Sequence, residues 1–148
     1  MTVTPLRALP PVLVADDDSD DCTLAKEAFE FASLQNPLRC LSDGEKLIEY
    51  LRQCVATGGI DCFPALILLD LNMPRMDGRE TLQALKADPA TRSIPVVVWT
   101  TSRSEDDIRH ARAAGCDDYL IKPSSFSEMV GMVRAIGERW LSWPDKIP

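Results

Sequence analysis

Polar side chains that could do chemistry follow four of the five short apolar runs in this chain. Three carboxylates, Asp16–Asp18, follow the first run, and Asp70 follows the third. The hydroxyls of Thr100 and Thr101 follow the fourth run, and Lys122 follows the fifth. Carboxylates that gather in one place repel one another and raise each other's pKa. A hard divalent cation with oxygen ligands, such as Mg²⁺, would relieve that repulsion.

These groups together suit phosphoryl transfer, in which catalysis consists mainly of positioning and charge stabilisation. A carboxylate can be the nucleophile and become an aspartyl phosphate. Asp70 is the carboxylate hardest to explain as a purely structural residue, since a carboxylate at the end of an apolar run needs a partner. Plainer interpretations exist for the others. Asp16–Asp18 with Ser19 could cap a helix, Thr100 could be an ordinary strand residue, and Lys122 could be a surface lysine.

The elements that position these groups follow from the pattern of apolar residues. Five apolar runs predict buried parallel strands, because several of them do not alternate with polar residues: Pro11–Ala15, Pro37–Leu41, Pro64–Leu69, Pro95–Trp99 and Asp117–Ile121. The runs begin roughly 20–30 residues apart, which is about one strand plus one helix. We expect an α/β fold, a five-stranded parallel sheet of doubly wound, flavodoxin-like (βα)5 type with strand order 2-1-3-4-5.

The segments between the runs carry helical periodicity. The last has the apolar stripe Phe126, Met129, Val130, Val133, Ile136 and Trp140, and the second has Leu47, Leu51, Cys54 and Val55. Asp43 is a predicted N-cap, and a third helix should run from Asp77–Gly78 to Asp88–Pro89. Strand alternation predicts that Trp99 points away from the polar pocket. In such sheets ligands bind beyond the carboxyl ends of the strands, so all four polar sets should converge there.

Composition sets limits on function. The chain has 148 residues and a net charge of −7, which disfavours nucleic-acid binding. No apolar run is long enough to cross a membrane, and residues 1–9 do not resemble a secretory signal. Five scattered cysteines favour reduced thiols and a cytoplasmic protein. The single histidine, His110, argues against a histidine-rich metal site.

Four segments resemble the signatures of the response-regulator receiver domain: Val12–Asp17, Ile67–Gly78, Pro95–Thr100 and Tyr119–Pro123. The resemblance extends from about residue 11 to residue 140. It implies that Asp70 is the phosphoacceptor, which attacks the phosphorus of a phosphohistidine on a sensor histidine kinase.

The same resemblance implies roles for the surrounding residues. Asp16, Asp17 and Asp70 would hold Mg²⁺, with Mn²⁺ or Ca²⁺ as substitutes, and the backbone carbonyl of Asn72 would complete the protein ligands. Lys122 would pair with the phosphoryl oxygens.

Three further roles concern the switch and its timing. Thr100 would turn inward to the phosphoryl group, and Tyr119 would change rotamer in concert. Asn72 and Ser102 would set how fast the phosphate hydrolyses. In the family the corresponding lysine–proline bond is commonly cis, so Lys122–Pro123 is expected to be cis.

At the level of the whole chain, we expect one receiver domain over residues 1–148, with a core over about 11–140 and an apolar C-terminal extension over 141–148. No room remains for an effector domain, so output should be by contact with a downstream protein. The lengthened loop Gly58–Cys62 and the tail Trp140–Pro148 are similar to those of single-domain regulators that partner phytochrome-type kinases. The last helix and tail would contribute to a homodimer.

Several alternatives remain open on the sequence alone. The domain could be a phosphorelay intermediate, or a pseudo-receiver that serves only as an interaction module. An aspartyl-phosphate hydrolase would carry a general acid at position 72, where this chain has Asn72. We therefore expect no enzyme beyond weak autophosphatase activity. A flavodoxin-like cofactor binder would need a phosphate loop where Asp16–Asp18 stand.

Overall fold

Five strands alternate with five helices in the computed structural model, which describes residues 9–58 and 62–141. The strands are β1 (Val12–Ala15), β2 (Leu38–Leu41), β3 (Leu66–Leu69), β4 (Val96–Thr100) and β5 (Asp118–Ile121). The helices are α1 (Ser19–Phe31), α2 (Gly44–Thr57), α3 (Gly78–Ala87), α4 (Glu105–Ala113) and α5 (Phe126–Trp140). Each predicted strand is present within two residues of its expected bounds.

All strand pairs are parallel, and the order is β2-β1-β3-β4-β5, as predicted. Strand β1 lies between β2 and β3, with Val12 level with Leu38 of β2 and Leu66 of β3. Every residue of β1, β3 and β4 is buried, whereas the edge strands β2 and β5 are partly exposed. The unbroken apolar runs therefore mark strands that are covered on both faces.

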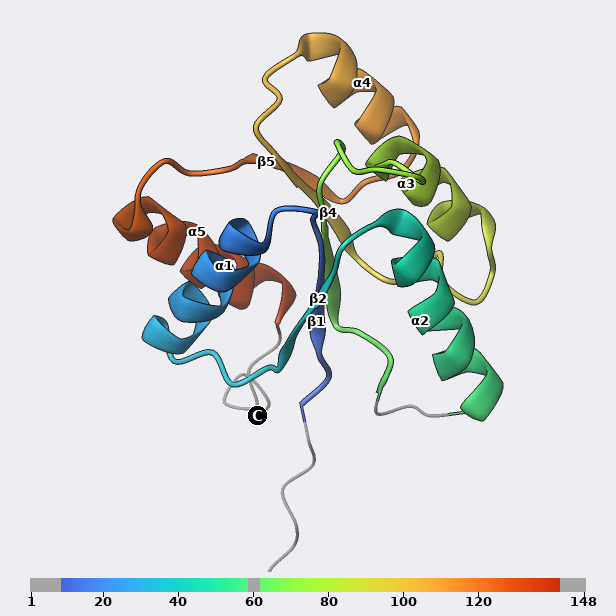
Figure 1. Cartoon of the computed structure of the whole chain (residues 1–148), viewed down its shortest axis with the longest axis horizontal. Coiled ribbons are helices and arrows are strands. Elements are labelled where there is room, and N and C mark those ends of the chain that lie inside the picture. The colour runs from blue at the N-terminus through green and yellow to red at the C-terminus, as the bar shows by residue number, and fades with distance from the viewer. Residues whose placement is uncertain (1–8, 59–61, 142–148) are drawn as a thin grey trace, which may run out of the picture.

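Helices cover both faces of the sheet, with α1 and α5 on one side and α2, α3 and α4 on the other (Figure 1). Alternate residues of β1 supply the two cores. Val12 and Val14 pack with α1 and α5, and Leu13 and Ala15 pack with the opposite layer. Trp99 joins the core under α1 and α5, as the alternation of β4 predicts.

Acidic and hydroxyl side chains begin the helices. Asp18 caps α1 and Asp43 caps α2, each by accepting a backbone N–H from the first turn. Asp77 caps α3, which ends at Ala87, as expected. The start of α3 packs tightly, because a Cβ atom at Gly78 would lie 2.1 Å from the carbonyl oxygen of Asp70. Only glycine lets α3 approach the loop after β3 this closely.

Each of the two predicted apolar stripes includes one terminal residue that is exposed instead of buried. Phe126 and Val55 are 38% and 47% exposed, although the rest of their helix faces is buried or half-buried. Phe126 begins α5 and packs edge-to-face on Phe31, which is also exposed. Periodicity alone does not show whether another element covers the end of a helix.

Four of the five cysteines lie side by side in pairs. Cys22 lies beside Cys40 and Cys54 beside Cys62, with Cα separations of 6.3 and 5.8 Å, and Cys116 is a thiol outside these pairs. The partners are 18 and 8 residues apart in sequence, so the fold and not the local sequence brings them together. The prediction of reduced thiols stays a prediction.

Within residues 9–58 and 62–141, no helix is long and apolar enough to cross a membrane. The expectations for the loop at 58–62 and for the extension at 141–148 fall mostly outside the described residues.

Candidate functional site

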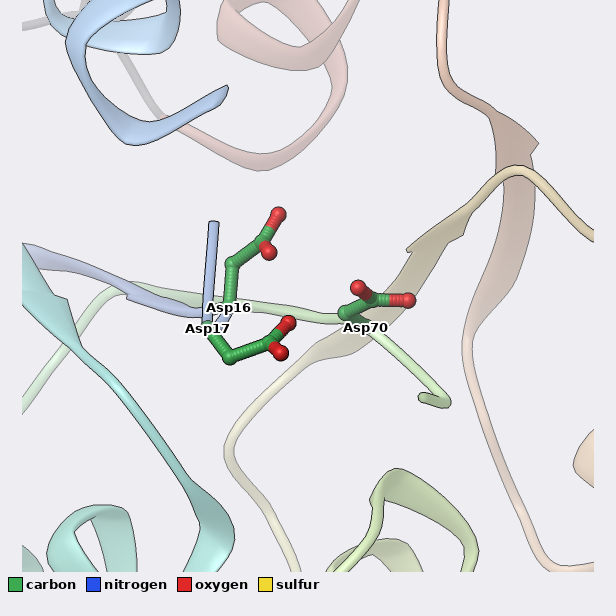
Figure 2. A group of neighbouring side chains, drawn as sticks. All are labelled: Asp16, Asp17 and Asp70. Atoms are coloured by element: carbon green, nitrogen blue, oxygen red, sulfur yellow. The ribbon is translucent and has the colours of Figure 1, made fainter. Parts of the chain in front are cut away.

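Three carboxylates meet at the carboxyl edge of the sheet. Asp16 and Asp17 follow β1 and Asp70 follows the adjacent strand β3, so the parallel pairing brings them together (Figure 2). The backbone N–H of Asp70 donates to the carbonyl of Ala15 over 3.0 Å, which holds the two strand ends in register. One oxygen from each carboxylate lies within 4.8 Å of the others. A hollow of about 270 Å³ opens beside Asp16 and Asp17.

Asp16 is the most deeply buried member of this cluster, at 4% exposure. Its Oδ1 accepts the backbone N–H of Asp18 over 2.9 Å. Its Oδ2 lies 2.8 Å from the ammonium of Lys122 but receives no well-aligned hydrogen bond. Burial raises the pKa of Asp16 to about 6, even though Lys122 and the Asp18 N–H lower it. The loss of hydration of this carboxylate therefore outweighs the stabilisation that Lys122 and the Asp18 N–H provide.

Asp70 is held from two sides. Its Oδ1 accepts the backbone N–H of Asn72 over 3.3 Å, and its Oδ2 accepts a hydrogen bond from Lys122 Nζ over 3.1 Å. Only 5% of the residue is exposed. The close approach of Gly78 to its backbone fixes the loop that carries it. Both oxygens are thus positioned by groups that stabilise negative charge.

Lys122 reaches the cluster from the end of β5. Its backbone N–H donates to the carbonyl of Thr100 over 2.8 Å, and its side chain is 9% exposed. Nζ lies 2.8 Å from Asp16, 2.7 Å from Asp21 and 3.1 Å from Asp70. Burial lowers the pKa of this lysine, but the hydrogen-bonded carboxylates raise it more, so it stays above its ordinary value. Lys122 is a fixed positive charge beside Asp70.

The three strand-end carboxylates fit a hard divalent cation. The buried Asp16 Oδ2 has an ion pair with Lys122 but no hydrogen bond, and its neighbours Asp17 and Asp70 offer further oxygens within 4.8 Å. Oxygen donors of this kind suit Mg²⁺ or Mn²⁺ and do not suit softer metals.

The residues expected to form a switch lie in contact on the other side of the site. Thr100 is fully buried, and its hydroxyl accepts the N–H of Ser102 over 3.4 Å. Tyr119 donates its hydroxyl to the carbonyl of Ser102 over 2.9 Å. The Ser102 hydroxyl donates to Asp107 over 2.6 Å, and Asp107 pairs with Arg79 of α3 at 2.8 Å. A chain of contacts therefore joins the loop after β4 to α3 and α4.

One expectation for the site is wrong. No cis peptide bond occurs in the described residues, so the Lys122–Pro123 bond is trans. Proline lowers the cost of the cis form without making it the preferred form, because trans remains favoured by roughly 0.5–1 kcal/mol.

The structure also adds residues that strand-end reasoning missed. Asp21 and Asp107 contact predicted site residues, but both lie on helices. Asp21 had a usable signal, since it stands one helical turn after Asp17 at the start of α1. No comparable sequence signal marks Asp107, because it lies apart in sequence from every strand end.

Comparison with known proteins agrees with this geometry. The family model described as the response regulator receiver domain matches residues 12–134. The chain is 39% identical over 132 residues to the probable methanogenesis regulatory protein FilR2 of Methanothrix harundinacea, covering 89% of this chain and 84% of that protein.

Solved structures give the same result. The phosphorylated cyanobacterial phytochrome response regulator RcpA is similar at TM-score 0.81 and 37% identity, over 91% of this chain and 96% of that one. The Mn²⁺-bound response regulator Rcp1, a Synechocystis protein, is similar at TM-score 0.77 and 35% identity, over 88% and 94% of the two chains.

Proposed function

The chain belongs to the response-regulator receiver domain family, and we propose that Asp70 accepts a phosphoryl group from a phosphohistidine of a sensor histidine kinase. The observation that carries this proposal is the position of Asp70. Its two oxygens face Lys122 and the Asn72 N–H, and the carboxylates of Asp16 and Asp17 lie alongside.

In the proposed reaction, an Asp70 oxygen forms a bond to phosphorus while the phosphorus–nitrogen bond to the kinase histidine breaks. The freed imidazole keeps the electron pair of that bond, and Asp70 becomes an acyl phosphate. Lys122 remains protonated throughout and offers its ammonium to the phosphoryl oxygens. Burial of Asp70 and Lys122 limits competing water, so the charge pairing near the phosphoryl group is strong.

We assign the metal ligands to Asp16, Asp17, Asp70 and the backbone carbonyl of Asn72. Mg²⁺ bound there would neutralise the carboxylates and offset charge on the phosphoryl oxygens. The missing hydrogen bond at Asp16 Oδ2 supports this assignment. The Mn²⁺-bound form of Rcp1 supports a divalent ion in a relative.

Thr100 and Tyr119 would report the phosphoryl group to the surface. Thr100 would exchange the Ser102 N–H for a phosphoryl oxygen, and Tyr119 would leave the Ser102 carbonyl as the loop moves. Asn72 and Ser102 would tune hydrolysis of the acyl phosphate. Asn72 cannot act as a general acid, which supports a phosphoacceptor with at most weak autophosphatase activity rather than a turnover enzyme.

The kinase partner we propose is of the phytochrome type, as the similarity to RcpA supports. The test is transfer of labelled phosphate from an autophosphorylated phytochrome-type kinase. We expect transfer to the wild-type protein and none to the Asp70→Asn variant. Transfer from unrelated kinases at the same rate would contradict the proposal that the partner is a phytochrome-type kinase. A protein that takes no phosphate from any kinase would be a pseudo-receiver.

A further inference from the structure

A fourth carboxylate contacts Lys122 from a different element. Asp21 lies in the first turn of α1, and its Oδ2 accepts a hydrogen bond from Lys122 Nζ over 2.7 Å. The bond from the same ammonium to Asp70 Oδ2 is longer, at 3.1 Å. The Asp21 side chain is only 26% exposed, so this ion pair is partly shielded from water. Such a pair is stronger than one at an open surface.

We propose that Asp21 is a positioning residue that anchors the ammonium of Lys122 beside the phosphoacceptor. This inference rests on the proposed function of Asp70. Of the three carboxylates that surround Lys122 Nζ, Asp16 is committed to the metal and Asp70 to the phosphoryl group. Asp21 has neither duty in that scheme, so its bond to Lys122 persists before and after phosphorylation.

The bonding changes during transfer make such an anchor useful. When an Asp70 oxygen bonds to phosphorus and the histidine nitrogen leaves, the carboxylate becomes a neutral acyl group and no longer holds Lys122 by charge. A bound cation would likewise take much of the negative charge of Asp16. The lysine must still reach the phosphoryl oxygens, and Asp21 keeps it close at that moment.

The packing around Lys122 offers few other contacts that could fix the position of its ammonium group. The face of the Trp99 ring lies 5.2 Å from Nζ, which gives a weak cation–π contact but no hydrogen-bond acceptor. Strand alternation also explains why an α1 residue is available. Val12, Val14 and Leu120 face the layer of α1 and α5, so Asp16 and Lys122, which continue that alternation, face it too.

Asp20 offers a matched control. It occupies the same turn of α1, carries the same charge and is exposed, and within the described residues it forms no ion pair. Asp20→Ala and Asp21→Ala therefore change the net charge and the helix terminus equally. We expect Mg²⁺-dependent phosphorylation by acetyl phosphate to be about tenfold slower in Asp21→Ala than in Asp20→Ala, which corresponds to one charge-assisted hydrogen bond. Asp21→Glu should recover most of the rate.

A double-variant comparison separates anchoring from a general structural effect. In a Lys122→Ala background, Asp21→Ala should change the slow residual rate by no more than about twofold, because its effect passes through the missing lysine. A tenfold loss that persists without Lys122 would overturn the proposal. Equal rates for Asp20→Ala and Asp21→Ala would also overturn it, while the proposed function would stand if both proteins were still phosphorylated on Asp70.

A second readout does not depend on phosphorylation. Side-chain NMR relaxation of Lys122 in the Mg²⁺-bound protein, in which the cation would take up the negative charge of Asp16 and Asp70, should show an ordered Cε–Nζ bond in the wild type and in Asp20→Ala. In Asp21→Ala the same bond should lose order. An unchanged order parameter would contradict the anchor, and a wild-type protein that takes no phosphate on Asp70 would remove the proposed function and this inference together.

Discussion

Asp16 and Lys122 are the side chains at this site on which burial acts most strongly. Burial raises the pKa of Asp16 to about 6, while the neighbouring carboxylates keep the pKa of Lys122 above its ordinary value. At neutral pH both groups are charged, but keeping the buried Asp16 carboxylate charged costs free energy, because burial removes its hydration. An added cation would remove that cost.

Cation binding should therefore depend on pH through Asp16. Because its pKa in the folded protein lies above its unfolded value, the metal-free fold loses stability as pH rises from about 4 to about 6. Below pH 6 a cation must displace a proton, so Mg²⁺ affinity should fall by about tenfold per pH unit and level off above it. Calorimetric titration of Mg²⁺ across this range tests the prediction. An affinity that is constant from about pH 5 to 7 would contradict it.

The sequence allowed the strand-end residues of the site to be predicted, because parallel strands all deliver their last residues to one edge. Asp16, Asp17, Asp70 and Lys122 follow apolar runs and were found in this way. Asp21 contacts the same lysine but comes from a helix, whose rotation relative to the sheet is set by packing of both elements. Local sequence does not encode that rotation.

Among the elements, α3 has the tightest connection to the site. Its first residue, Gly78, abuts the backbone of Asp70 and Leu71, and the Gly78 N–H donates to the Leu71 carbonyl over 3.0 Å. The start of this helix thus supports the loop that presents the phosphoacceptor. Any side chain at position 78 would push the loop and helix apart.

Gly78→Ala should lower the free energy of unfolding by about 1–3 kcal/mol and slow phosphorylation, because the added methyl group meets backbone rather than a flexible side chain. Urea unfolding and the rate with acetyl phosphate measure both effects. Gly131→Ala in α5 is the control, since a Cβ there meets nothing within 4 Å. That change should stabilise the protein by about 0.5–1 kcal/mol. Equal stabilities for the two variants would refute the account of Gly78.

Element boundaries were predictable where a physical signal coincides with them. Asp43 caps α2 as predicted, and Asp77 caps α3 where the third helix was expected to begin. Phe126 was misjudged because a helical stripe does not show whether another element covers its end. The cysteine pairs depended on how α1 lies against β2, which is a tertiary relation.

The whole molecule has two faces of different chemistry. The carboxyl edge of the sheet is acidic and polar, and the layer of α1 and α5 exposes the aromatic pair Phe31 and Phe126. Phe31 is 64% exposed, which is unusual for a phenylalanine. This pair supports the proposal that α5 contributes to a homodimer.

Dimerisation would be seen in the mass measured by light scattering at rising concentration, with and without phosphorylation. We expect the mass to approach twice that of one chain and Phe126→Ser to shift the transition to higher concentration. Arg134→Ser, an exposed position later in α5, is the control and should leave the transition unchanged. A monomer mass at the highest concentration in both states would contradict the proposal.

The central claim is that Asp70 carries the phosphoryl group, and intact-mass spectrometry tests it most directly. The protein is incubated with acetyl phosphate in the presence and absence of Mg²⁺, beside the Asp70→Asn variant. Our account predicts one added phosphate that requires Mg²⁺ and is missing in the variant. An adduct that persists in Asp70→Asn, or a wild-type protein that gains no phosphate with Mg²⁺ present, would contradict it.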